Sequence, residues 1–309
     1  MSATPVFSAL SFYPHTSGLL GVVEGRMAEL TGLPESDPGP VQSGSAHAAV
    51  AYHLQSGGKR VRAQLALRAG LALGLTPADS IAIAACVELL HNASLVHDDL
   101  QDRDKTRRGV ETVWTLFGDG VAICAGDLLL SAAFCSLARF SQTAVIPQLL
   151  TLVHTRTAAA IHGQCADLTA TQSNAVMNAA TYKRIVVAKS GAFFSLPLEL
   201  ALVGSGQTQW AATAQRAAEA FAIGYQIADD IDDFEEDTGH GPASHSSNVY
   251  FMLNAANGEP ADHADNVPRD AARKLGLSQL RLAVALAETL PAQCGALLVE
   301  IASRLAEKL

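Results

Sequence analysis

The sequence predicts an all-α protein, and three observations support that prediction. Alanine and leucine are abundant in a chain of 309 residues, of which 49% are hydrophobic, and runs of β-branched residues are few. Apolar residues recur at helical spacing over long stretches. No alternation of short strands and turns indicates a sheet. We therefore expect one large helical bundle with an extensive buried core.

The helical stretches follow one another along most of the chain. Helices are expected over residues 77–96, 121–140, 146–168, 181–203 and 208–233. Thr76 and Pro77 suit the N-cap and the first position of the first of these helices. Clusters of Gly, Ser and Pro predict loops at 32–45, 204–207 and 239–247. A further loop over 254–268 is expected before a final helical hairpin.

The domain organisation follows from where these patterns begin and end. Residues 1–45 are expected to be an irregular N-terminal segment, and residues 46–309 are expected to form a single helical domain. The helices continue without a change of composition until about residue 238, so no boundary between two domains is predicted.

Charge and composition exclude several classes of function. The formal net charge of −9 would repel a phosphate-rich polymer, so no nucleic-acid partner is expected. The five cysteines are widely spaced and form no CxxC motif, which predicts reduced, mostly buried thiols in the cytoplasm. No basic region precedes an apolar run at the N-terminus, so no signal peptide is expected. The apolar run 81–87 stops at Glu88, which is too short for a membrane-spanning segment.

Two acidic clusters are the first candidates for a functional site. Each has three aspartates at positions i, i+1 and i+4, which share one face of a helix. The members are Asp98, Asp99 and Asp102 in the first cluster and Asp229, Asp230 and Asp233 in the second. Like charges on one face need a cation if the face is buried, and Mg²⁺ prefers such oxygen ligands. Either cluster alone is as typical of a solvated helix end as of a metal site.

Three basic segments could complete a site for diphosphate. Residues 57–62 read Gly-Gly-Lys-Arg-Val-Arg, where glycines let backbone amides approach phosphate and arginines bind it bidentately. Arg107 and Arg108 follow the first acidic cluster closely. Lys189 stands beside Ser190 and a glycine in an apolar helical stretch, which indicates a local break in that helix. His91 lies two turns before Asp98 on the same face, although a lone histidine is more often a hydrogen-bonded core residue.

Together these segments resemble the trans-isoprenyl diphosphate synthases of the polyprenyl synthetase family, such as geranylgeranyl and farnesyl diphosphate synthases. The matching runs are GGKRVRAQL (57–65), ELLHNASLVHDDLQDRDKTRRG (88–109), AICAGDLLLSAAF (122–134), GQCADL (163–168), AKSGAFF (188–194) and GYQIADDIDDF (224–234). They occur in the family's order. The resemblance implies the isoprenoid synthase fold, a helical bundle around a deep central cavity, and a homodimer.

The resemblance also implies a role for each candidate residue. The two aspartate clusters would bind an allylic diphosphate through Mg²⁺, with about three ions per active site. The residues implied to bind isopentenyl diphosphate are Lys59, Arg62, His91 and Arg108. Those implied to contact the allylic diphosphate are Arg107 and Lys189, and those implied to line the path of the carbocation are Ser190 and Gln226. The reaction would ionise the allylic diphosphate, condense the cation with isopentenyl diphosphate and eliminate a proton.

The loop after the second acidic cluster departs from the family's pattern. Active relatives carry one or two lysines there, whereas residues 238–248 have none, and no Lys or Arg occurs between Arg216 and Arg269. His240 and His245 are candidate replacements, although histidine is mostly neutral at pH 7. Besides a chain-elongating synthase, two alternatives stay open: a terpene cyclase-like enzyme that ionises diphosphates, and a weakly active or non-catalytic partner subunit. The complete set Lys59, Arg62 and His91 argues against a cyclase, which needs no second substrate site.

The length of the product is expected to depend on side-chain size just before the first cluster. Ala93 and Ser94 are both small, so the cavity would not be blocked there, and the resemblance then implies a product beyond C15, with C20 as the central expectation. Phe134 on the next helix could form a deeper floor.

Overall fold

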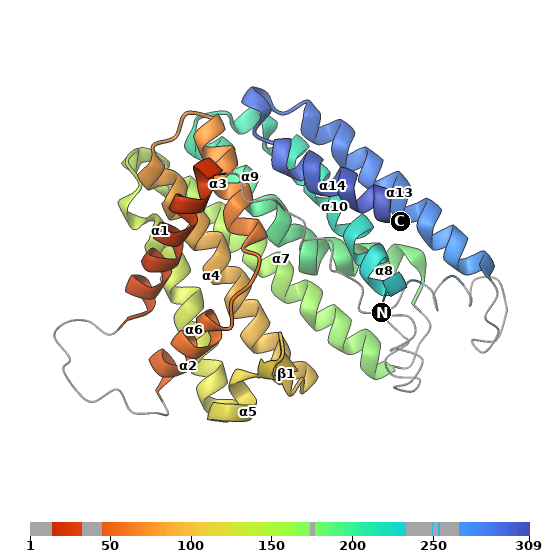
Figure 1. Cartoon of the computed structure of the whole chain (residues 1–309), viewed down its shortest axis with the longest axis horizontal. Coiled ribbons are helices and arrows are strands. Elements are labelled where there is room, and N and C mark those ends of the chain that lie inside the picture. The colour runs from red at the N-terminus through yellow and green to blue at the C-terminus, as the bar shows by residue number, and fades with distance from the viewer. Residues whose placement is uncertain (1–13, 33–44, 174–176, 233–248, 250–252, 254–265) are drawn as a thin grey trace.

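The structure is a computed structural model that describes residues 14–32, 45–173, 177–232, 249, 253 and 266–309 (Figure 1). The described part is helical apart from one two-stranded hairpin, which confirms the expected all-α class. The helices are α1 (Pro14–Thr31), α2 (Ala46–Gln55), α3 (Val61–Ala72), α4 (Pro77–Asp102), α5 (Val113–Phe117), α6 (Asp119–Ser136), α7 (Ile146–Ser173), α8 (Ala179–Val186), α9 (Ala192–Gly204), α10 (Ala211–Asp232), α13 (Asn266–Glu288) and α14 (Ala296–Lys308). The hairpin pairs β1 (Thr106–Arg107) with β2 (Val110–Glu111).

Helix α4 lies at the centre of one half of the bundle, packed against α1, α3, α6 and α9. It begins as expected, because the Thr76 side chain accepts a hydrogen bond from the Asp79 amide at 3.1 Å and Pro77 follows it. The helix continues beyond residue 96, where the sequence predicted its end, and stops at Arg103. Its apolar middle is buried, so the first aspartate cluster forms the last turn of a core helix.

Helices α9 and α10 form the other half together with the final hairpin of α13 and α14 (Figure 1). Helix α13 packs closely along α10, because Gly224 leaves room for the Leu280 side chain: a Cβ on Gly224 would lie 2.6 Å from Leu280 Cγ. The expected final helical hairpin is therefore confirmed, with α13 beginning at Asn266. Between α8 and α9 the chain forms a π-helical turn, Val187–Gly191, so the predicted local break at Lys189 is also confirmed.

Two expectations about chain segments and cysteines are wrong. Part of the N-terminal segment 1–45 is regular, because α1 is a helix whose Val23 and Met27 are each only 1% exposed and belong to the core. The apolar stripe of α1 is short and interrupted by glycines, which hid it in the sequence. Three of the five cysteines, Cys124, Cys135 and Cys165, are exposed rather than buried, although all five are free thiols.

Three helical stretches are long and apolar enough to cross a membrane by length and composition alone. They are Pro77–Asp102, Asp119–Arg139 and Ala179–Gly204. The first and third bury 67% and 78% of their apolar windows inside the bundle, whereas the second buries 44%. Most apolar surface of α4 and α9 therefore serves the core, and the expectation of a chain that does not span a membrane stays a prediction.

Candidate active site

The first acidic cluster lies at the C-terminal end of α4 and is held by Arg107. Asp99 is 1% exposed, and its Oδ1 accepts a hydrogen bond from Arg107 Nε at 2.6 Å. In the part of the chain that the structure describes, the buried Asp99 Oδ2 has no hydrogen-bond partner. Burial raises the pKa of Asp98 to about 6 and also raises the pKa values of Asp99 and Asp102. The cluster therefore holds negative charge in a poorly solvated place, where a cation would be bound favourably.

Lys189 faces the first cluster from the π-helical turn. Its Nζ donates to Asp167 Oδ2 at 2.9 Å. Burial acts to lower the pKa of Lys189, but the carboxylates of Asp167, Asp98 and Asp102 outweigh burial and raise it, so the side chain is charged. Gly163 on α7 permits this placement, because a Cβ there would lie 2.6 Å from the Lys189 backbone nitrogen. The close approach of α7 thus fixes the π-helical turn against the cluster.

In the second acidic cluster, Asp230 is buried and hydrogen-bonded, whereas Asp229 is exposed. Asp230 is 6% exposed, and burial raises its pKa to about 7. Its Oδ1 accepts from Gln226 Nε2, and its Oδ2 accepts from Tyr182 Oη and the Val249 amide, each at 2.8 Å. Asp229 is exposed, and Asp233 lies outside the described residues. In this conformation both oxygens of Asp230 are engaged by the protein, so it acts as an anchor for α8 and residue 249.

Arg62 and His91 contact each other between α3 and α4. Arg62 NH1 lies 3.1 Å from His91 Nε2, and the guanidinium carbon lies 4.2 Å from the centre of the Phe194 ring. Burial and the neighbouring Arg62 hold the pKa of His91 well below its usual value, so the imidazole is neutral. Among the described residues, Arg62 Nε is a buried donor without a hydrogen-bond partner. An anionic ligand would satisfy it.

Arg108 extends this cationic group toward the glycine loop. Its guanidinium donates to the Gly57 carbonyl, and a Cβ on Gly58 would lie 2.9 Å from Arg108 NH1. Gly58 leaves room for the end of the Arg108 side chain at this position. Burial and the charge of Arg108 lower the pKa of Lys59, and the charge of Asp229 opposes this. The structure thus brings Lys59, Arg108 and the second cluster to the same end of the bundle.

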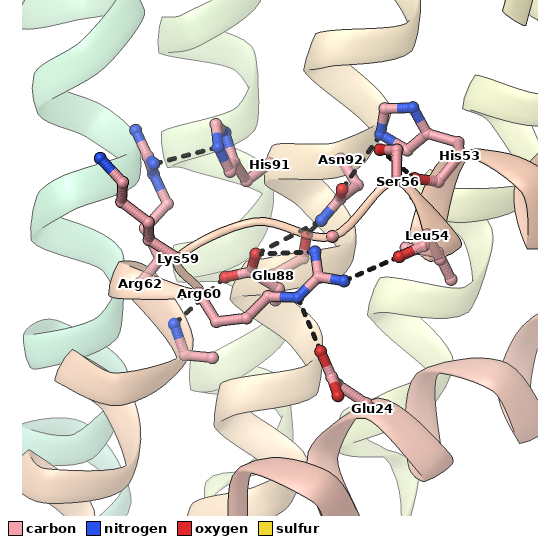
Figure 2. Close-up of polar contacts among 12 residues, drawn as sticks. Glu24, His53, Leu54, Ser56, Lys59, Arg60, Arg62, Glu88, His91 and Asn92 are labelled. Atoms are coloured by element: carbon pink, nitrogen blue, oxygen red, sulfur yellow. Dashed lines mark hydrogen bonds and ion pairs between the residues drawn. The ribbon is translucent and has the colours of Figure 1, made fainter. Parts of the chain in front are cut away.

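A polar network that is buried except for Glu24 lies next to these cations (Figure 2). Arg60 contacts Glu24 and Glu88, and Asn92 Nδ2 donates to the Glu88 carbonyl at 2.7 Å. Asn92 Oδ1 lies 3.0 Å from His53 Nε2. Burial, followed by the charge of Arg108, lowers the pKa of His53 to about 4. The network joins the first four helices below the glycine loop.

A cavity of about 250 Å³ opens beside the first cluster. Arg62, Asp98, Lys189 and Ser190 are among its polar lining residues. Its apolar walls include Leu90, Ala93, Leu130, Ile161 and Phe193, and Ser94 also lines it. Phe134, expected as a deeper floor, does not line this cavity, whereas Leu130 one turn earlier on α6 does. The cavity therefore combines charged groups with apolar walls, and the two small residues Ala93 and Ser94 of α4 are part of its lining.

The donor set fits Mg²⁺ bound together with phosphate. Within the described ranges, no group of three or more His, Cys, Asp or Glu side chains is arranged to hold a metal ion alone. Mg²⁺ is commonly held by one or two carboxylates and completed by substrate phosphates and water. Asp98 and Asp102 provide such carboxylates, and the unpaired Asp99 Oδ2 provides a further oxygen. The residues present therefore suit the ion, with a diphosphate supplying the remaining ligands.

Sequence reasoning missed several residues that hold the candidate site in place. Asp167 pairs with Lys189, Tyr182 holds Asp230, and Glu88 lies within the buried network. Gln164 Nε2 donates to Gln101 Oε1 at 3.0 Å between α7 and α4. Glu88, Gln164 and Asp167 stand in runs that matched the family, which was the available signal, but their partners are distant in sequence.

Comparison with known proteins agrees with this geometry. The family model named Polyprenyl synthetase matches residues 45–241, which is more than half of the chain. The chain belongs to the polyprenyl synthetase family. A short chain isoprenyl diphosphate synthase of Methanothermobacter thermautotrophicus is 31% identical over 185 residues, and a farnesyl diphosphate synthase of Geobacillus stearothermophilus is 34% identical over 196 residues. Each match covers 60% of this chain.

The family's solved structures share the fold over nearly the whole chain. The geranylgeranyl pyrophosphate synthetase of Geoglobus acetivorans superimposes with a TM-score of 0.79 at 25% identity, covering 94% of this chain and 98% of that one. A decaprenyl diphosphate synthase of Rhodobacter capsulatus gives the same TM-score at 20% identity, which supports the fold alone. The matched regions span only 57% and 65% of the two curated relatives' lengths.

The buried His53 makes stability depend on pH. In the unfolded chain His53 is protonated below its ordinary pKa of 6.5, whereas in the folded protein it stays neutral until about pH 4. The free energy of unfolding therefore decreases as the pH is lowered from about 6.5 to about 4. At pH 5 we expect a loss of about 2 kcal/mol from this group. His53→Gln keeps an amide donor near Asn92 but cannot titrate. Chemical unfolding at pH 7 and pH 5 should show a smaller loss in the variant, and equal losses would contradict the assignment.

Proposed function

We propose that the protein is an all-trans prenyltransferase that condenses isopentenyl diphosphate with an allylic diphosphate. The observation that carries the proposal is the cavity that begins at Asp98 and Lys189 and continues between apolar walls. A diphosphate group suits its charged end, and a prenyl chain suits its apolar part. Family membership supports the same reaction.

The allylic diphosphate would lie at the charged end, where the chain's own groups favour ionisation. Lys189 and Arg107 would bind the leaving pyrophosphate, since both are charged and tied to carboxylates of this end. Mg²⁺, when bound by the aspartates, would supply further positive charge to that leaving group. The expected number of about three ions is part of this proposal.

The carbocation would then be protected by the walls of the cavity. Ser190 lines the cavity directly, whereas Gln226 donates to Asp230, so we assign Ser190 to the path of the cation and Gln226 to positioning the second cluster. Apolar side chains exclude water that would quench the cation. The π-helical turn places Lys189 and Ser190 together at the start of this path.

Isopentenyl diphosphate would occupy the neighbouring cationic group. Lys59, Arg62, His91 and Arg108 converge there, and Arg62 keeps a buried donor free for phosphate in the described structure. This second anion site distinguishes a condensing enzyme from a cyclase, which needs one diphosphate site. After condensation, the departing pyrophosphate would accept the eliminated proton.

The lysine-free loop 238–248 lies outside the described residues. Two lysines elsewhere lie near the second cluster. Lys308 Nζ is 2.5 Å from Asp232 Oδ2, and the charge of Lys59 interacts with that of Asp229. Lys59 of the glycine loop therefore contributes positive charge at this cluster, which supports activity without a loop lysine, whereas Lys308 pairs with Asp232 beside the cluster.

Turnover can be tested with the purified full chain. Isopentenyl diphosphate and geranyl or farnesyl diphosphate should together release pyrophosphate and give a longer prenyl diphosphate with Mg²⁺ present. Excess EDTA should abolish the release, and added Mg²⁺ should restore it. Release from the allylic substrate alone would instead indicate a cyclase-like enzyme, and no release with either allylic substrate would refute the proposed enzyme.

Product length should depend on Ser94. We propose a product beyond C15, with C20 as the central expectation, because Ala93 and Ser94 leave the cavity open. Ser94→Phe should fill the cavity and shorten the main product by at least one isoprene unit. Phe134→Leu is the matched control, since Phe134 does not line the cavity. Chromatography of the dephosphorylated products is the measurement, and an unchanged distribution in Ser94→Phe would refute the proposed role of the cavity.

We also propose that the chain forms a homodimer through the face around α6. Ile123 and Leu116 are 49% and 50% exposed, and Val110 on the adjacent hairpin is 40% exposed. Contiguous exposed apolar surface is typical of association surfaces, and we propose that these side chains belong to one. Sedimentation equilibrium should give twice the 32.2 kDa chain mass, and a monomer at micromolar concentration would contradict the dimer. A cytoplasmic location stays a prediction.

A further inference from the structure

Arg60 stands at an unusual backbone position between two residues of the proposed isopentenyl diphosphate site. It is the N-cap residue of α3, with φ 49° and ψ 37°, in the left-handed region. Gly57 and Gly58 precede it with φ values of 79° and 144°. Glycine adopts such values freely, but a residue with a Cβ is strained there. Something outside the loop must therefore hold Arg60 in place.

Contacts from three other helices hold the Arg60 side chain. Its Nε donates to Glu24 on α1 at 3.1 Å, and its NH2 donates to the Leu54 carbonyl of α2 at 3.0 Å. Its NH1 lies 3.5 Å from Glu88 Oε1 on α4. The side chains of Arg60 and Glu88 are 4% and 3% exposed. The guanidinium is therefore shielded from solvent, and its neighbours are protein acceptors.

Glu88 performs two further tasks at the start of α3. Its Oε2 accepts from the Ala63 amide at 3.3 Å, which replaces the cap that the Arg60 side chain does not give. Its charge also stabilises the cations above it: burial is the main cause that lowers the pKa values of Arg62 and Arg108, and Glu88 opposes that lowering in both. One buried carboxylate thus orients the helix end and balances the neighbouring cations.

The geometry separates Arg60 from its two neighbours in sequence. In Figure 2 the side chains of Lys59 and Arg62 point to the same side, near His91, whereas the Arg60 guanidinium points toward Glu24. On α4, Glu88 and His91 are one turn apart, so the contact of Arg60 with Glu88 lies one turn below that of Arg62 with His91.

We propose that Arg60 and Glu88 are positioning residues for the isopentenyl diphosphate site, holding the left-handed start of α3 so that Lys59 and Arg62 face one anion. This inference rests on the proposed function. Arg60 does not touch the substrate, because its donors are directed to Glu24, Glu88 and Leu54. The allylic site is formed by the last turn of α4, Arg107 and the π-helical turn, which lie away from the start of α3, so it should respond less to this pair.

The test compares Michaelis constants for the two substrates. Arg60→Met should raise the KM for isopentenyl diphosphate by about tenfold or more, the effect of weakening one charge-assisted hydrogen bond. The KM for the allylic diphosphate should change less than about twofold. Arg60→Lys, which keeps the charge but cannot reach three acceptors, should give an intermediate value. An unchanged KM for isopentenyl diphosphate, or equal increases for both substrates, would overturn the inference.

Arg68→Met is the matched control on the same helix. Arg68 also contacts a glutamate of another helix, Glu300 of α14, at 3.4 Å, but away from the glycine loop. Both Michaelis constants should stay within about twofold of the wild type. If Arg68→Met raises the KM for isopentenyl diphosphate as strongly as Arg60→Met does, general destabilisation of α3 explains the effect and the inference fails.

A double variant separates positioning from stability, even if Arg60→Met fails to fold. Arg60→Met with Glu88→Gln removes both charges of this ion pair and keeps an acceptor for the Ala63 amide, so neither partner of the pair is left as an unpaired buried charge. Its thermal unfolding midpoint should lie near that of the wild type, while its KM for isopentenyl diphosphate should stay raised. A KM restored to the wild-type value would overturn the inference. Absence of turnover in the wild type would refute the proposed function itself, and this inference with it.

Discussion

The burial of α4 is the constraint on which the rest of the site depends. Its apolar middle packs against α1, α3, α6 and α9, so the helix can neither rotate nor slide without exposing core surface. The helix therefore fixes the positions of its functional side chains along its axis, with a rise of about 1.5 Å per residue. These side chains are Glu88, His91, Ser94 and Asp98. Along α4 these residues are, in order, the partner of Arg60, the partner of Arg62, a wall of the cavity and a member of the first acidic cluster.

Charge in the site is balanced locally rather than by solvent. Burial raises the pKa of Asp98 and lowers that of Arg62, so both kinds of group are destabilised in their charged forms. The ion pairs of Asp99 with Arg107 and of Lys189 with Asp167 offset part of that cost. Binding a metal diphosphate would add positive and negative charge together, which suits a site where, among the described residues, Arg62 Nε and Asp99 Oδ2 have no hydrogen-bond partner.

Much of the fold, and some of the local features of the candidate site, could be predicted from the sequence. Helical periodicity indicated the long helices, and Thr76 with Pro77 marked the start of α4, because capping and burial are local or periodic properties. The spacing of Asp98, Asp99 and Asp102 placed them on one face. The break at Lys189 was visible because a glycine follows a lysine within an apolar helix.

What the sequence by itself determined is thus the residue types and the order of the elements that carry them. Only the tertiary structure decided which residues meet: Arg60 with Glu88, Asp167 with Lys189, and Tyr182 with Asp230, pairs that are 22 to 48 residues apart. It also decided that α1 joins the core and that Phe134 lies outside the cavity. Such contacts depend on how buried helices pack in three dimensions, and the pattern along one chain does not specify that packing.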